Sequence, residues 1–196
     1  MNTDESADYK PTYRFKTLQQ IEDLCKSNLV SHDDKIYNDC IVYVYMIRSE
    51  RMYYLACPND KCNRKVFEAE NEKFRCETCG KNYDDANPRY MLSTLLTDSS
   101  SQIWATFYDK EAQALLSRSA QDFRQLKESS QDSLISEMLK ENQFKEVKVR
   151  IKSSLDTYMG DTKIRHGIFK IFEGAADRDL QLCHKELELY LEQETK

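Results

Sequence analysis

Glycine and proline are scarce in this chain of 196 residues, which contains four glycines and three prolines. The glycines form no Gly-rich phosphate-binding loop, so the nucleotide-binding folds that depend on such a loop are excluded. No apolar run approaches the roughly 20 residues that a membrane-spanning helix requires. His32, His166 and His184 are the only histidines, and they are too widely separated to suggest a nucleophile and its base. Nothing in the sequence argues for an enzyme.

An excess of basic residues is also absent. Lys and Arg number 29 against 34 Asp and Glu, which gives a net charge of −5. A protein that binds nucleic acid over its whole surface is basic, so such a function would need a local basic face. The first residues, "MNTDESADYK", are acidic and polar and do not resemble a signal peptide. We expect residues 1–14 to be a disordered acidic tail, and we expect a reducing compartment, where paired cysteines bind metal more often than they form disulfides.

The remaining sequence alternates strand-like and helical segments. We expect a short helix over Phe15–Ser27, followed by two β-rich runs around the polar tetrad Arg48–Arg51, a pattern typical of a hairpin. Two further β-rich runs joined by three serines predict a second hairpin. Residues Lys110–Asn142 contain no Gly or Pro and indicate two or three helices. A last pair of strands flanks the turn Met159–Asp161, and the chain beyond Gly174 has a helical pattern.

Four of the seven cysteines lie in two close pairs. Their spacing, C-x4-C-x13-C-x2-C, suits a tetrahedral zinc site, because each tight loop supplies two thiolates without strain. Four cysteine ligands leave no open position for an activated water, so the metal is predicted to be structural. The alternative interpretation is two disulfides or four unrelated buried thiols. The predicted zinc ligands are Cys57, Cys62, Cys76 and Cys79.

The outward faces of two predicted strands carry aromatic and basic residues. In "QIWATFYD", alternation places Trp104 and Tyr108 on the face opposite the core. In "KEVKVRIKS", the residues on the polar face are Lys148, Arg150 and Lys152.

The window Lys145–Lys170 contains seven Lys or Arg against three Asp or Glu, and Tyr158 lies at its turn. Aromatic rings among cations suit single-stranded nucleic acid, because stacking contributes about 1–3 kcal/mol per base and the cations neutralise phosphates. The alternatives are ordinary polar residues on half-buried strands, with Trp104 and Tyr108 packed under the helical segment.

A heptad pattern runs through "AADRDLQLCHKELELYLEQETK" at the end of the chain, where Ala176, Leu180, Cys183, Leu187 and Tyr190 are spaced 4-3-4-3. This helix either folds back on its own domain or docks against partner helices, in which case Leu180, Cys183, Leu187 and Tyr190 are the predicted partner-binding residues.

In this order, the segments resemble the C-terminal DNA-binding domain of the replication protein A large subunit, an OB-fold interrupted by a zinc ribbon. The resemblance spans about residues 15–174 and includes the cysteine spacing. The strings that carry it are "TLQQI", "YLACPNDKCNRKV", "FRCETCGKNYDDANPRYMLS", "QIWATFYDKEAQALL", "FKEVKVRIKSSLDTY" and "KIRHGIFKIF".

The resemblance implies a mainly β fold with helices: a five-stranded OB-fold barrel over 15–174, a zinc ribbon inserted between strands 1 and 2 at about 54–87, and a C-terminal assembly helix at 175–196. It implies zinc binding by the four paired cysteines and a nuclear location. In the family, the tail helix joins helices of the middle and small subunits. The implied base-stacking residues are Trp104, Tyr108 and Tyr158, and the implied backbone-contacting residues are Lys148, Arg150, Lys163 and Arg165.

We therefore interpret the chain as a non-enzymatic single-stranded DNA-binding module with one structural Zn²⁺ and partner subunits, but no membrane or small-molecule substrate. The alternative is an OB-fold scaffold of a telomere- or meiosis-specific complex that mainly mediates trimer assembly. A zinc-ribbon enzyme subunit or nucleic-acid-processing factor is a third interpretation. Because the chain starts almost directly at the domain, we expect either a fragment of a longer protein or a stand-alone relative.

Overall fold

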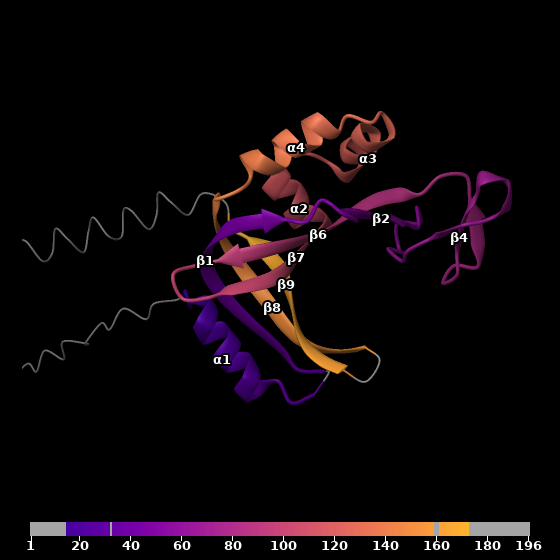
Figure 1. The fold of residues 1–196 in the computed structure, drawn as a ribbon. Coiled ribbons are helices and arrows are strands. Elements are labelled where there is room, and N and C mark those ends of the chain that lie inside the picture. The colour runs from indigo at the N-terminus through magenta and orange to yellow at the C-terminus, as the bar shows by residue number, and fades with distance from the viewer. Residues whose placement is uncertain (1–14, 32, 159–160, 173–196) are drawn as a thin grey trace, which may run out of the picture.

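A β-barrel with helices at two ends and a small ribbon on one side is the architecture of residues 15–31, 33–158 and 161–172, which a computed structural model describes (Figure 1). The side chains of Glu72 and Tyr158 are outside this description. In chain order the elements are α1 (Leu18–Asn28), β1 (Lys35–Ile47), β2 (Tyr53–Ala56), β3 (Phe67–Glu68), the 3-10 helix Glu70–Glu72, β4 (Phe74–Cys76), β5 (Lys81–Tyr83), β6 (Asn87–Thr97), β7 (Gln102–Tyr108), α2 (Asp109–Leu116), α3 (Ala120–Glu128), α4 (Asp132–Glu141), β8 (Glu146–Tyr158) and β9 (Asp161–Ile171).

The main sheet closes on itself. Its strand order is β1-β8-β9-β7-β6-β2, and an additional pairing of β1 with β6 completes the barrel. The β7–β9 pairing is parallel, and the other pairings of this sheet are antiparallel. Strands β3, β4 and β5 form a separate sheet, the ribbon, which extends from the barrel between β2 and β6 (Figure 1). The predicted OB-fold class, with a ribbon inserted after the first barrel strand, is confirmed.

The hairpin expected around Arg48–Arg51 is wrong. Strands β1 and β2 do not pair with each other; both pair with β6, where Ile47 is opposite Thr94 and Tyr53 is opposite Tyr90. Arg51 has a positive φ of 54°, so the chain kinks there and resumes its course along the same neighbour. The 11-residue β6 is long enough to pair with both segments. In contrast, β6 and β7 form the predicted hairpin, as do β8 and β9.

Helix α1 covers one end of the barrel and buries Leu18, Ile21 and Cys25 against it. The helix begins at a capping box in which Thr17 and Gln20 bond reciprocally to backbone N–H groups. The turn between β6 and β7 adds a carboxylate from Asp98, which accepts a hydrogen bond from the Leu18 N–H at 2.7 Å. The helix expected in this region is therefore confirmed.

Helices α2, α3 and α4 pack over the opposite end of the barrel (Figure 1), which agrees with the prediction of two or three helices. Phe123 of α3 is buried and contacts Tyr90 edge to face. None of the described helices is both long and apolar enough to span a bilayer.

Two predictions fall outside the described residues. The tail expected at 1–14 and the helix expected at 175–196, with Leu180, Cys183, Leu187 and Tyr190, belong to parts of the chain that the structure does not describe. They stay predictions, as do the domain bounds drawn from them.

Candidate nucleic-acid interface and metal centre

Four cysteine sulfurs meet at the base of the ribbon. Cys57 follows β2, Cys62 lies in the next loop, Cys76 ends β4 and Cys79 lies in the turn before β5. All four sulfur atoms lie within 4.8 Å of one another. The Cys57 and Cys79 sulfurs are 3.8 Å apart, and so are the Cys62 and Cys76 sulfurs.

These distances fit a metal centre. A tetrahedron with Zn–S bonds of about 2.3 Å has sulfur–sulfur edges of roughly 3.8 Å. A disulfide requires about 2.05 Å between sulfurs, so the structure rules out the disulfide alternative for these four residues. The donor set of four thiols suits Zn²⁺, and it leaves no position at which a metal-bound water could react.

Hydrogen bonds at the sulfur atoms prepare this cluster for a cation. The backbone N–H of Cys79 donates to Cys76 Sγ at 3.4 Å, and Gly80 completes the turn at a φ of +66°, which glycine adopts without strain. Burial raises the pKa of the Cys57 thiol, but hydrogen bonds from the Asn59 backbone and the Tyr83 side chain outweigh it and lower the pKa to about 7. At Cys57 the thiolate, the form that binds metal, is therefore accessible near neutral pH, whereas a hydrogen bond with Cys62 and burial raise the pKa of Cys79.

Strand β7 presents an aromatic face away from the core. The expected alternation is confirmed: Ile103, Ala105 and Phe107 are buried, whereas Trp104 and Tyr108 are 37% and 41% exposed. Neither aromatic residue packs under the helices, so that alternative is wrong.

The neighbouring strand β6 continues this face. Ser93 is opposite Thr106, and Met91 is opposite Tyr108, so their side chains lie on the same side of the sheet. Arg48, at the end of β1, places its guanidinium 4.1 Å from the centre of the Trp104 ring. The cation therefore covers one face of the indole and leaves the rest of the ring toward solvent.

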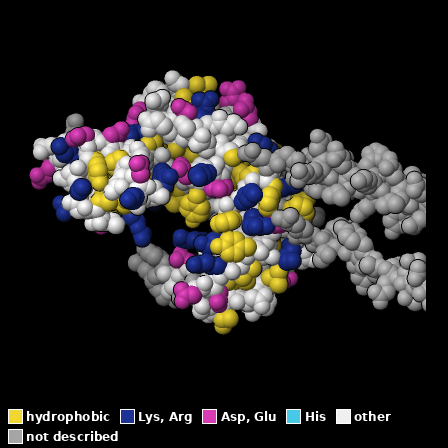
Figure 2. All heavy atoms as spheres, turned by 180° about the vertical axis from the view of Figure 1, so that it is seen from behind, with side chains coloured by type: hydrophobic (Ala, Val, Ile, Leu, Met, Phe, Trp, Pro, Cys, Tyr) yellow, Lys and Arg dark blue, Asp and Glu magenta, His cyan; other side chains and the backbone are white. Residues whose placement is uncertain are grey.

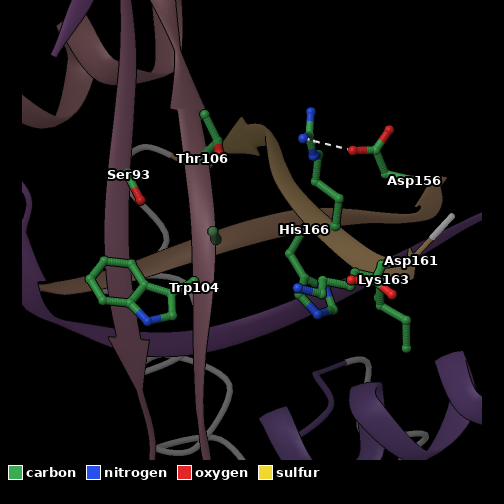
Figure 3. Close-up of a pocket in the computed structure, with 10 residues that line it drawn as sticks. Ser93, Trp104, Thr106, Asp156, Asp161, Lys163 and His166 are labelled. Carbon is green, nitrogen blue, oxygen red and sulfur yellow. Dashed lines mark ion pairs between the residues drawn. The ribbon is translucent and has the colours of Figure 1, made fainter. Parts of the chain in front are cut away.

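A groove of about 490 Å³ lies between this face and the β8–β9 hairpin (Figure 3). Trp104 borders it on one side, and Lys163 and His166 of β9 border it on the other. Arg165 also lines the groove and forms a 2.7 Å ion pair with Asp156, in which both side chains are largely exposed.

Seen from behind, the molecule is hollowed between the ribbon and the β8–β9 hairpin, and Lys and Arg side chains border the hollow (Figure 2). The two projections thus flank a surface that carries basic side chains, and Asp156 and Asp161 line the groove together with Lys163 and Arg165.

The basic residues of β8 do not join Trp104. Lys148, Arg150 and Lys152 are opposite Ile41, Asp39 and Tyr37 of β1, and β9 separates their strand from β7. Arg150 holds the buried Asp39 carboxylate with bonds of 2.6 and 2.9 Å, and its charge is therefore already compensated.

Tyr158, which the sequence predicted as a site residue, and His166, which it did not, both belong to the β8–β9 hairpin. Tyr158 is opposite Asp161 at the end of the β8–β9 hairpin, but its side chain is not described. His166 is buried, and its Nδ1 lies 2.8 Å from the Ser153 hydroxyl. Because Ser153 is fully buried, this pair is not an exposed nucleophile and base.

Arg48, Ser93 and His166 are among the residues of the groove region that sequence reasoning missed. Arg48 was expected in a turn, Ser93 looked like an ordinary strand residue, and His166 carried no motif. Alternation along β6 could have found Ser93. No local pattern could have found Arg48, because its contact with Trp104 bridges β1 and β7 across β6.

Comparisons with known proteins give a consistent result. The family model described as "Replication factor-A C terminal domain" matches residues 37–180. The chain is 32% identical over 152 residues to the "Replication protein A 70 kDa DNA-binding subunit" of Danio rerio, covering 77% of this chain and 24% of that protein. It is 31% identical over 125 residues to "Replication factor A protein 1" of Saccharomyces cerevisiae, covering 64% of this chain and 20% of that protein. The chain thus spans about a quarter of the length of the curated relatives it matches.

Solved structures agree with these relatives. One described as "Structure and Conformational Change of a Replication Protein A Heterotrimer Bound to ssDNA" matches with a TM-score of 0.75 and 27% identity, covering 87% of this chain and 39% of that chain. Another, "Yeast RPA bound to ssDNA", matches with a TM-score of 0.70 and 26% identity, covering 87% of this chain and 96% of that chain.

Proposed function

Because the chain belongs to the replication factor-A C-terminal domain family, we propose that it is a non-enzymatic module that binds single-stranded DNA in the groove beside Trp104. The observation that carries this proposal is an exposed indole that borders a groove lined by Lys163 and Arg165. The relatives support it, because their printed names describe a DNA-binding subunit and complexes with ssDNA.

In the proposed complex, bases stack on Trp104 and Tyr108, with Tyr158 at the hairpin tip as a third stacking residue. Arg48 fixes the orientation of the indole from one side, so a base uses the side that faces solvent. Stacking of this kind contributes about 1–3 kcal/mol per base and tolerates any sequence.

Phosphates are held by the basic residues at the edges of the surface. Lys163 lies in the groove itself. Arg165 is paired with Asp156, but an exposed ion pair contributes only about 0–1 kcal/mol and can exchange Asp156 for a phosphate. Lys148 and Arg150 lie on the side formed by β1 and β8, and we assign to Arg150 the additional role of compensating the Asp39 charge.

The ribbon is proposed to hold one structural Zn²⁺ through Cys57, Cys62, Cys76 and Cys79, which the sulfur geometry supports. When bound, the ion supplies no chemistry beyond crosslinking β2 to the turn before β5. Its role is to fix the ribbon beside the groove.

The chain is further proposed to assemble, in the nucleus, with middle and small subunits of a replication protein A-like trimer through the segment 175–196. This rests on the printed description of a relative as a heterotrimer and on the heptad spacing of that segment. The scaffold alternative, with little DNA binding, is not favoured by these relatives.

An anisotropy titration with a fluorescein-labelled oligothymidine tests the proposal. We expect binding of roughly 4–16 nucleotides with little sequence preference. Trp104→Ala should weaken binding about 5- to 100-fold, whereas Tyr45→Ala, which removes another exposed ring of β1, should not change it. Equal affinity of the wild type and Trp104→Ala would refute the stacking assignment. If the wild-type chain failed to bind at all but still assembled with partner subunits, the scaffold function would replace it.

A further inference from the structure

A second exposed aromatic site lies on the β1–β8–β9 side of the barrel. Tyr37 of β1 and Phe169 of β9 meet edge to face across β8, with ring centres 5.2 Å apart. They are 46% and 55% exposed, which is more than Trp104 or Tyr108. Tyr45 and Phe144 form another exposed pair of this kind, so exposure alone does not indicate a ligand, and the charges beside each pair have to be compared.

Lysines frame this pair. Lys152 of β8 is opposite Tyr37 on one side and Gly167 on the other, so it stands between the two strands that carry the rings. Lys170 follows Phe169 on β9, is exposed, and places its Nζ 5.3 Å from the centre of the Phe172 ring. The acidic residue of this region, Asp39, is buried and bound to Arg150, so it does not cancel the lysines. The site therefore complements an anion.

The pair is continuous with the surface beside Trp104. A Cβ atom at Gly167 would lie 3.2 Å from Tyr108 Cε2, which means that the Tyr108 ring extends from β7 over this glycine. Phe169 lies two residues further along β9, on the same side as Gly167. Tyr108, Phe169 and Tyr37 thus form a row that crosses β7, β9 and β1.

We propose that the Tyr37–Phe169 pair, with Lys152 and Lys170, is a second stacking site for single-stranded DNA, occupied by nucleotides that continue past Tyr108. This inference rests on the proposed function and extends the path of the strand around the barrel. It implies a longer binding site than the groove alone would give.

The geometry favours a nucleic-acid strand over a peptide. Strand β8, which lies between the two rings, has a hydrogen-bonded neighbour on both sides, so no peptide strand can be added to it. Flat rings beside lysines match the alternation of bases and phosphates along a DNA strand. Stacking requires only an exposed ring face and therefore no deep groove.

The test compares two oligonucleotide lengths on the full chain. An oligothymidine of about 6 nucleotides reaches Trp104 and Tyr108, and one of about 16 nucleotides also reaches the second site. The test variant is Tyr37→Ala/Phe169→Ala. The matched control is Tyr45→Ala/Phe144→Ala, which removes another exposed edge-to-face pair, with ring centres 6.0 Å apart. Lys145, beside the control pair, already donates to the Leu115 carbonyl oxygen and Asn142 Oδ1.

We expect the test variant to bind the long oligonucleotide about 5- to 100-fold more weakly and the short one as the wild type does. The control variant should bind both as the wild type does. A second variant, Lys152→Glu, should weaken only the long oligonucleotide and make its binding less dependent on salt.

Three outcomes would overturn the inference. Long-oligonucleotide binding that depends on Trp104 but not on Tyr37, Phe169 or Lys152 would leave the proposed function intact and refute the second site. Capture of an acidic, aromatic test peptide by the wild type and not by Tyr37→Ala/Phe169→Ala, with DNA binding unchanged, would make this surface a protein-docking site. Absence of binding to either oligonucleotide would refute the proposed function itself.

Discussion

The barrel and the ribbon bury very different amounts of apolar surface. The barrel core is a continuous cluster of Leu, Ile, Val and Phe side chains that extends from α1 through all the barrel strands to α2–α4. The buried cluster of the ribbon consists of three cysteines, Val66 and Ala86, and Phe67 of β3 is half exposed. Hydrophobic burial can therefore stabilise the barrel, whereas the ribbon requires a crosslink from its metal centre.

The proposed DNA-stacking residues lie on the barrel, whereas the metal centre lies in the ribbon. The groove residue Trp104 is on the barrel, and so is the Tyr37–Phe169 pair. The ribbon joins the barrel through β2, which pairs with β6 from Tyr53 to Ala56. Loss of the metal should thus disturb one border of the DNA surface without removing its rings.

The largest effect is expected on removal of the metal. Structural zinc contributes apparent free energies of about 10–16 kcal/mol in small zinc domains, far more than the ribbon cluster can supply. Cys76→Ser, or treatment with a chelator, should unfold β3–β5 and leave the barrel folded. Hydrogen exchange measured by NMR would show loss of protection in the ribbon only, and added zinc should restore it after chelation. Simultaneous loss of protection in β8 and β9 would show that the barrel also depends on the metal, which would contradict this prediction.

The converse change should act on the barrel alone. Phe107 is fully buried, and Phe107→Ala should lower the free energy of unfolding by about 3–5 kcal/mol. Urea denaturation followed by circular dichroism measures this loss. Zinc content of the folded variant should remain one ion per chain, and zinc loss under native conditions would show that the ribbon depends on the barrel core.

Substitutions of Arg150 and Lys163 should differ in their effects on the free energy of unfolding and on DNA binding. Arg150→Met removes two charged hydrogen bonds to the buried Asp39 carboxylate and should lower the free energy of unfolding by about 1–3 kcal/mol. Lys163→Met should change stability by less than about 0.5 kcal/mol.

DNA binding of these two variants provides the contrast. Lys163→Met should reduce the slope of log K against log salt by about 0.7, the value for one phosphate contact. Denaturation and anisotropy titrations of both variants give these quantities. An unchanged salt slope in Lys163→Met would remove that residue from the DNA surface.

The smallest effect concerns pH. Burial lowers the pKa of His166 below its usual value of about 6.5. As the pH falls through 6.5, the unfolded chain therefore binds more protons than the folded chain. The free energy of unfolding keeps its full value above pH 6.5 and decreases below it. The loss is at most about 1.4 kcal/mol per pH unit. Between pH 7.5 and 5.5, the free energy of unfolding measured with urea should decrease less for His166→Gln than for the wild type. An equal decrease in both proteins would assign the pH dependence to other groups.

Local patterns in the sequence predicted much of this fold. The two cysteine pairs are close in sequence, so their spacing alone indicates a metal site, and the alternation along β7 separates Phe107 from Trp104 without tertiary information. The expected hairpin at Arg48–Arg51 failed because the choice of pairing partner is non-local: β6 offers an 11-residue edge to β1 and β2 together.

The arrangement of the basic residues was beyond such patterns. Alternation correctly places Lys148, Arg150 and Lys152 on one face of β8, but it cannot say which side of a closed barrel that face occupies. The ion pair of Arg150 with Asp39 and the contact of Tyr37 with Phe169 both join distant segments.

The most direct test of the central claim uses the intrinsic fluorescence of Trp104, because this is the only tryptophan of the chain. The account predicts that unlabelled oligothymidine quenches this emission with a saturable curve whose midpoint equals the Kd from anisotropy and rises with salt. Anisotropy that reports binding while the emission of Trp104 stays constant would contradict it.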